Sequence, residues 1–285
     1  MAHADRLPVA RLTGGLPPTA LVLLGIVSVQ VGAAFAKQLF AVAGAAGTVT
    51  LRLVVAAVVL VAIWRPSLRL DRRVLVVVLS YGVVLGAMNL CFYFALERIP
   101  LGAAVTIEFL GPLAVAVAGS RRWLDGLWVL LAGTGVVLLT RVEGGLALPG
   151  VLFALAAGAC WAAYILLAAK LGSKSSDGKG LALAMVVGSA VALPFGISSA
   201  GTAMLDPVVL AAGLAVALMS SVIPYSLELE ALRRMPPRVF GILMSMEPAV
   251  AALAGLALLG EQLKPMQWVA VSCVVVASVG STRSA

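Results

Sequence analysis

The chain contains one short motif twice, ALERIP at residues 95–100 and ALRRMP at residues 231–236. An apolar run follows each copy, and each run contains a proline, Pro112 in the first and Pro248 in the second. Alanine, leucine, arginine and both prolines match at a constant separation of 136 residues, close to half of the 285-residue chain. This regular separation predicts an internal duplication.

The composition is typical of a membrane protein. Hydrophobic residues make up 62% of the chain and charged residues 11%, and the mean hydropathy is +1.11. A soluble domain has roughly 45–50% apolar and about 25% charged residues. The net charge of +8 comes from cations in short clusters between apolar runs. That distribution indicates membrane topology and argues against a nucleic-acid partner.

The apolar runs predict the number of membrane crossings. One crossing needs about 20 helical residues. Ten runs of about this length occur, with short breaks rich in proline, glycine and charge: 18–38, 44–64, 73–96, 101–119, 124–141, 148–170, 180–198, 207–229, 237–259 and 265–282. We therefore expect an all-α polytopic membrane protein with ten transmembrane helices in a lipid bilayer.

The cations predict the orientation. If the N-terminus is cytoplasmic, 15 of the 20 lysines and arginines lie in cytoplasmic segments and four in outer segments, with Arg52 inside a helix. Cytoplasmic loops of membrane proteins are enriched in these residues. We expect both termini to be cytoplasmic.

Ten helices in two copies leave five helices in each copy. Because five is odd, the second copy enters the membrane from the opposite side. We expect a 5+5 inverted-topology repeat with halves at residues 1–143 and 144–285. Such repeats occur in many secondary transporters.

Two glutamates lie inside apolar runs. Glu108 is about 10 Å into its predicted helix and Glu247 about 15 Å into its own, at about 1.5 Å per residue. A charged acid facing lipid is costly, so each must face the bundle interior, pair with a cation or be protonated. The functional interpretation is a contact for a substrate ammonium or a proton site. The structural alternative is a helix–helix hydrogen bond or an internal ion pair.

Two cations also lie inside predicted helices. Arg52 is eight residues into the second run, where its side chain cannot easily reach either membrane surface. It either forms a structural ion pair with a glutamate or captures a substrate carboxylate. Lys37 lies near the outer end of the first run, so we expect it to extend to the membrane surface.

Polar and aromatic residues within the helices are candidates for lining a cavity. Asn89 and Tyr93 are four residues apart and Trp161 and Tyr164 three apart, so each pair shares a helix face. Gln30 and Tyr225 are further candidates. The alternative for these residues is hydrogen bonding between packed helices.

The two repeated prolines predict distortions. Each removes one backbone donor and frees a carbonyl four residues earlier, that of Glu108 for Pro112 and that of Met244 for Pro248. Interrupted helices are tolerated in a membrane where they line a cavity.

The sequence offers little for an enzyme. His3 is the only histidine, and the three cysteines lie in apolar runs without a CxxC spacing. Nucleotide-binding, hydrolase and zinc-protease motifs are missing from the sequence. We expect no catalytic residues, no metal and no cofactor, and the short loops also disfavour a membrane-anchored scaffold.

The chain resembles the bacterial threonine/homoserine exporters of the EamA branch of the drug/metabolite transporter superfamily. The resemblance runs over nearly the whole chain and is carried by residues 28–37 (SVQVGAAFAK), 88–93 (MNLCFY), 108–116 (EFLGPLAVA), 158–166 (GACWAAYIL), 224–228 (PYSLE) and 244–249 (MSMEPA). It implies a central cavity between the halves and export of small amino acids and analogues, coupled to protons, in the bacterial inner membrane.

The leading hypothesis is a secondary exporter of zwitterionic amino acids, acting as a monomer or a homodimer. Glu108 or Glu247 would accept a proton or the substrate ammonium, and Arg52 or exposed backbone would meet the carboxylate. Gln30, Asn89, Tyr93, Trp161, Tyr164 and Tyr225 complete the predicted site. The alternative is export of other metabolites, aromatic compounds or cationic drugs.

Overall fold

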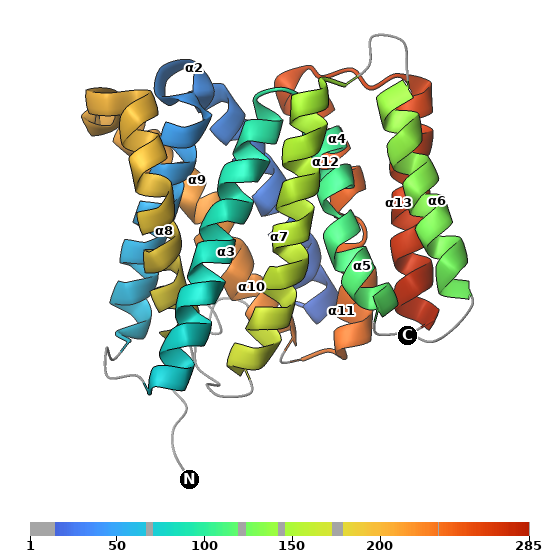
Figure 1. Cartoon of the computed structure of the whole chain (residues 1–285), viewed down its shortest axis with the longest axis horizontal. Coiled ribbons are helices and arrows are strands. Elements are labelled where there is room, and N and C mark those ends of the chain that lie inside the picture. The colour runs from blue at the N-terminus through green and yellow to red at the C-terminus, as the bar shows by residue number, and fades with distance from the viewer. Residues whose placement is uncertain are drawn as a thin grey trace.

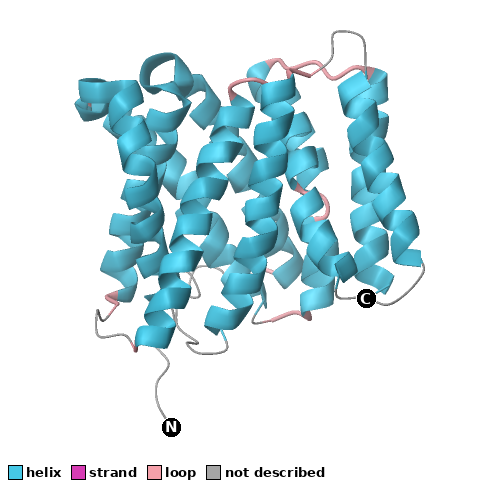
Figure 2. Cartoon of the chain, in the orientation of Figure 1, coloured by secondary structure: helices cyan, strands magenta, loops and turns pink. Residues whose placement is uncertain are grey.

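The described part of the protein is built from helices. The computed structural model describes residues 15–66, 71–118, 124–141, 146–172, 179–232 and 234–284. Within these ranges the chain forms helices and short connections and no strand (Figure 1 and Figure 2). The predicted all-α fold class is confirmed.

The helices follow one another in two series. The first series comprises α2 (Pro18–Trp64), α3 (Arg72–Leu96), α4 (Leu101–Glu108), α5 (Leu110–Ala118) and α6 (Leu124–Arg141). The second comprises α7 (Leu148–Gly172), α8 (Lys179–Ala200), the 3₁₀ helix η1 (Gly201–Leu205), α9 (Pro207–Ala217), the π-helical turn η2 (Leu218–Val222), α10 (Ile223–Leu232), α11 (Pro237–Met244), α12 (Glu247–Leu259) and α13 (Pro265–Ser284).

Helix α2 combines two of the predicted runs. It has 47 residues, and its helical geometry is interrupted at Gly44, where φ is 65° and ψ is 171°. A straight helix of that length would be about 70 Å long, roughly twice the thickness of a bilayer core. The runs predicted at 18–38 and 44–64 are therefore two limbs of one element, joined at a glycine kink.

Eight helices in the described ranges are long and apolar enough to cross a membrane, and Gly126–Leu139 of α6 is a shorter apolar helix. The multi-pass character is thus as expected, whereas the ten-helix count and the 5+5 division remain predictions. Large apolar side chains cover the outside of the bundle, including Val58, Leu130 and Val208, which are 64%, 70% and 77% exposed. Lipid is the solvent that such a surface requires.

Two predicted runs are each divided into two helices a few residues before their proline. The run at 101–119 is interrupted between Glu108 and Leu110, and the run at 237–259 between Met244 and Glu247. Glu108 and Met244 are the residues four positions before Pro112 and Pro248. Because proline cannot donate to the carbonyl at that position, the helix ends there.

Helices from the two halves of the sequence are packed together. Helix α2 contacts α8, α9 and α10, α6 contacts α13, and α4 and α5 contact α7. Figure 1 shows α3 between α8 and α7, and both are its contact partners. Small residues permit this packing: a Cβ added to Gly86 of α3 would lie 2.7 Å from the carbonyl oxygen of Gly188 in α8.

The bundle has two distinct ends. Leu21, near the start of α2, packs in one apolar cluster with Met235 and Phe240 around the α10–α11 turn. Near the end of α13, the side chain of Thr282 lies beside Gly241. We call this the α11 end. The opposite end, where Lys37 meets Glu261, is called the Glu261 end.

The kink in α2 provides a test of the fold. The φ of Gly44 is positive, a conformation that costs a residue with a Cβ about 1–3 kcal/mol. We expect Gly44→Ala to lower the free energy of unfolding by that amount, measured as a lower melting temperature in detergent. The control is Gly133→Ala in α6, where nothing lies within 4 Å of an added Cβ. Equal melting temperatures for the two variants would contradict the role of the kink.

Candidate functional site

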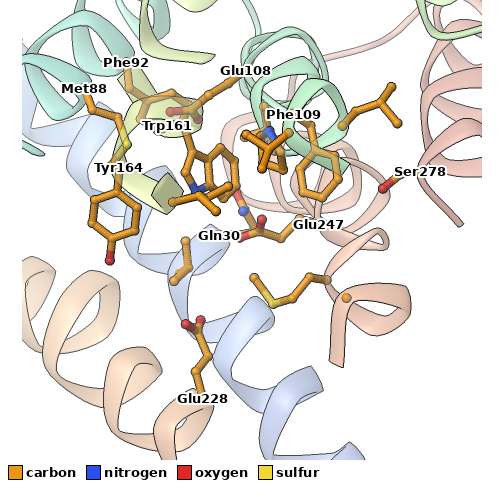
Figure 3. A pocket seen from close by; sticks show the side chains of 18 of the residues that line it. Gln30, Met88, Phe92, Glu108, Phe109, Trp161, Tyr164, Glu228, Glu247 and Ser278 are labelled. Atoms are coloured by element: carbon orange, nitrogen blue, oxygen red, sulfur yellow. The ribbon is translucent and has the colours of Figure 1, made fainter. Parts of the chain in front are cut away.

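A cavity of about 540 Å³ is lined by residues from both halves of the sequence (Figure 3). This volume lies within the range of about 300–1,000 Å³ that is usual for small-molecule sites. Eight of the nine predicted site residues line it: Gln30, Arg52, Asn89, Glu108, Trp161, Tyr164, Tyr225 and Glu247. The ninth, Tyr93, is fully buried behind the wall.

Three carboxylates line this cavity. Glu108 is the last residue of α4 and Glu247 the first residue of α12, and both are buried. The third is Glu228 of α10, which Figure 3 shows across the cavity from Glu108. The dipole of α12 favours a negative charge at its N-terminus, where Glu247 lies. Glu108 lies at the C-terminus of its helix, where the helix dipole disfavours a negative charge. The two acids therefore have different electrostatic surroundings.

Among the described residues, Arg52 is the cation of the cavity wall. Its side chain is 8% exposed. Nε donates to Ser221 Oγ at 3.1 Å, Nη2 to the carbonyl oxygen of Ser220 at 3.1 Å, and Nη1 to Tyr93 Oη at 3.3 Å. All three acceptors are neutral, so within the described ranges the predicted alternative of an ion pair with a glutamate is not formed. A guanidinium has five N–H donors, and two remain for a ligand.

Tyr93 supports Arg52 from behind. The Arg52 guanidinium carbon lies 5.6 Å from the centre of the Tyr93 ring, in addition to the hydrogen bond. Phe40 also packs against Tyr93, with the two ring centroids 5.7 Å apart. The shared helix face predicted for Asn89 and Tyr93 therefore does not put both into the cavity. Asn89 lines it while donating to Leu85 O of its own helix at 2.9 Å.

Aromatic residues form an apolar part of the wall. Trp161 packs edge-on against Phe109 with ring centroids 5.5 Å apart and an interplanar angle of 89°. Tyr164 packs against Tyr81 of α3 with centroids 4.7 Å apart. Both Trp161 and Tyr164 line the cavity, as expected from their spacing on α7. Such a wall binds the apolar part of a ligand through contact area.

Three buried oxygens of cavity-lining residues have no partner within the described part of the chain: Gln30 Oε1, Ser220 Oγ and Glu247 Oε2. Buried polar atoms in native proteins are usually paired with protein or water. The Gln30 oxygen accepts hydrogen bonds only, the Glu247 oxygen accepts them while the carboxylate is ionised, and the serine hydroxyl can both accept and donate. The cavity is therefore suited to a ligand with both donor and acceptor groups.

Glu228 and Ser220 line the cavity but are not among the predicted site residues, and Ser221 does not line it but accepts a hydrogen bond from the cavity residue Arg52. Glu228 follows Tyr225 by three residues on α10, a spacing that could have placed it on the cavity face. The two serines carry no such signal, because serine inside an apolar helix is commonly a helix–helix contact.

The Glu261 end of the cavity is closed by packing and by an ion pair. Lys37 Nζ lies 2.6 Å from Glu261 Oε1 and donates to Ile99 O at 3.0 Å, while Glu261 Oε2 accepts from the backbone N–H of Leu101 at 2.7 Å. The expectation that Lys37 extends to the membrane surface remains a prediction, and the structure shows that its ammonium pairs with a carboxylate of the α12–α13 connection. Ala33, Leu101 and their neighbours form the buried cluster below this pair.

Toward the α11 end, the lining continues through Phe240, Gly241 and Thr282. These residues belong to the start of α11 and the end of α13. The cavity therefore extends to the end of the bundle at which α2 begins and α13 ends.

Comparisons with known proteins agree with each other. The model of the EamA-like transporter family matches residues 148–283. The threonine/homoserine exporter RhtA of Escherichia coli K12 is 43% identical over 269 residues, covering 93% of this chain and 91% of the exporter. The exporter of the same name from Salmonella typhimurium LT2 is 42% identical over the same shares. A crystal structure with 18% identity covers 93% of this chain and 99% of its own with a TM-score of 0.58, a likeness of fold alone.

The closure at the Glu261 end can be tested by comparing two acids. Glu261 is partly buried and accepts two hydrogen bonds, whereas Glu97 pairs with Arg98 at the surface. We expect Glu261→Ala to lower the free energy of unfolding by about 1–3 kcal/mol. The matched variant Glu97→Ala should cost about 0–1 kcal/mol. Thermal unfolding in detergent measures both, and a Glu97→Ala loss as large as that of Glu261→Ala would count against the closure.

Proposed function

This chain belongs to the EamA-like transporter family, and we propose that it is a secondary active exporter of small amino acids such as threonine and homoserine. The observation that carries the proposal is the 43% identity, over 93% of the chain, to a protein named as a threonine/homoserine exporter. The relatives are named as transporters and not as enzymes.

The charges around the cavity match a zwitterion. An α-amino acid presents an ammonium group with three N–H donors and a carboxylate that accepts hydrogen bonds. Glu247 Oε2 and Gln30 Oε1 are unpartnered acceptors for the ammonium. Arg52 has N–H donors left for the carboxylate. Burying a charge is costly unless it is paired, so the zwitterion and the cavity groups would neutralise each other.

The architecture supports alternating access. If the two limbs of α2 cross separately and α6 also crosses, the eight candidate spans become the ten predicted helices. Each half, 1–143 and 144–285, then contains one proline-broken helix, α4–α5 or α11–α12. We propose that the halves form an inverted repeat in the inner membrane with both termini cytoplasmic. The cavity extends to the α11 end and is closed at the Glu261 end, and rocking of the halves would reverse this.

The number of acids supports coupling to protons. Among the described residues that line the cavity, three carry a carboxylate and one carries a guanidinium. A zwitterion has no net charge, so its binding does not change the excess of carboxylates over cations. Some cavity carboxylates therefore have no cation with which to pair. In a low-dielectric cavity such groups bind protons readily. We propose that one of them carries the proton that moves against the amino acid.

A second candidate function is export of larger, cationic or aromatic compounds. The cavity of about 540 Å³ is large enough for a drug-sized molecule. Its aromatic wall and its three acids would favour a ligand with an apolar body and a positive charge.

Proton coupling can be measured with reconstituted protein. We expect an imposed pH gradient to raise threonine flux into proteoliposomes several-fold. Glu247→Gln should abolish this increase and retain threonine exchange without a gradient. The glutamine side chain has the shape of the glutamate but cannot bind and release a proton. Glu97→Gln, at the surface, is the control. Flux that is the same with and without the gradient in the natural protein would rule out coupling. Full gradient-driven flux in Glu247→Gln would remove that residue from the mechanism.

Arg52 separates the two candidate functions. If it binds a carboxylate, Arg52→Ala should reduce threonine flux at least about 10-fold while export of a cation without a carboxylate is retained. Arg52→Lys keeps the charge but loses the planar fork, so an intermediate flux is expected. Flux is normalised to folded protein by size-exclusion chromatography. Unchanged threonine flux in Arg52→Ala would favour the second function.

A further inference from the structure

The π-helical turn η2 interrupts an otherwise α-helical segment from Pro207 to Leu232. Single π-helical turns are rare and often occur at functional sites. This turn contains Ser220 and Ser221, which are 2% and 0% exposed. The segment thus brings two serines into the interior of the bundle.

Both limbs of α2 hold the turn in place. Ser28 Oγ of the first limb donates to Met219 O at 2.7 Å, and Arg52 Nη2 of the second limb donates to Ser220 O at 3.1 Å. A Cβ at Gly32 would overlap Ser220 Oγ, so glycine is needed for this close approach. The position of Ser220 is therefore defined by contacts on two sides.

The two serine hydroxyls have different roles. Ser221 Oγ accepts from Arg52 Nε at 3.1 Å and helps to hold the guanidinium. Ser220 Oγ has no partner among the residues that the structure describes, although Ser220 and Arg52 line the same cavity. A buried hydroxyl without a partner is unfavourable, and this one is next to an arginine that has two N–H donors left.

We propose that Ser220 is a substrate-binding residue whose hydroxyl donates to the α-carboxylate held by Arg52. A carboxylate has two oxygens that accept several hydrogen bonds, so it can bind the guanidinium and the hydroxyl at the same time. This inference rests on the proposed export of amino acids and names the residue that completes the carboxylate subsite. It makes Ser220 a determinant of selectivity for α-amino acids over amines without a carboxylate.

Threonine and homoserine together test the inference. They share the α-carboxylate, but their hydroxyl groups are on different carbons. Loss of a contact with the carboxylate must therefore raise the KM of both substrates equally. Loss of a contact with a side-chain hydroxyl would raise the KM of one substrate more than that of the other. We expect Ser220→Ala to raise the KM of both substrates by about 10- to 100-fold with little change in maximal flux, because the lost interaction is a charge-assisted hydrogen bond.

The control is Ser226→Ala on the neighbouring helix α10. Its hydroxyl donates to Val222 O of its own helix at 2.6 Å, and it is not among the cavity-lining residues. We expect its KM for both substrates to match that of the natural protein. Misfolding of Ser220→Ala would lower maximal flux at constant KM, which the same curves reveal, and that result would count against a binding role.

Four further outcomes are decisive. An unchanged KM in Ser220→Ala, or a KM change confined to one substrate, would overturn the carboxylate contact. An equal change in Ser226→Ala would show that the effect is structural and would overturn it as well. Failure of the natural protein to transport either amino acid would instead contradict the proposed function, so the two failures are distinguishable.

Discussion

A charged group in the interior of a membrane protein has to find its partners within the protein or in a ligand, because lipid supplies none. Arg52 meets this constraint through Tyr93 on α3 and through Ser220 and Ser221 on η2. These contacts join the second limb of α2 to a helix of the first half and to a turn of the second half. The cavity lies beside this junction, and Arg52 lines it with two N–H donors that these three contacts leave unused.

The same constraint explains the two broken helices. Pro112 and Pro248 cannot donate to the carbonyls of Glu108 and Met244, so α4 and α11 end at those residues. The carbonyl of Glu108 is packed closely on α7, where a Cβ at Gly158 would lie 2.7 Å from it. The repeated prolines therefore place one break in each half. The two acids are not at equivalent positions relative to the two prolines, so Glu108 ends a helix and Glu247 begins one.

Hydropathy and spacing selected nine candidate residues, and eight of them line the cavity. Trp161 and Tyr164 share a face of α7 by local geometry, and the cost of a charge in lipid directs Glu108, Glu247 and Arg52 inward wherever the helices pack. Tyr93 shows the limit of this reasoning. It shares a face with Asn89, but it is covered by Phe40 and contacts Arg52 from behind, since neighbouring helices decide which part of a face remains open.

By itself, the sequence determined the helical membrane fold and the inward position of Glu108, Glu247 and Arg52, because these follow from the transfer free energy of each side chain and from helix periodicity, whereas the 5+5 duplication remains a prediction. Tertiary structure decided which groups meet. Lys37 pairs with Glu261 across 224 residues, and Arg52 contacts Ser221 across 169. No local pattern encodes such contacts. They depend on how closely the backbones approach, as at Gly32 and Ser220, and that is a property of the packed bundle.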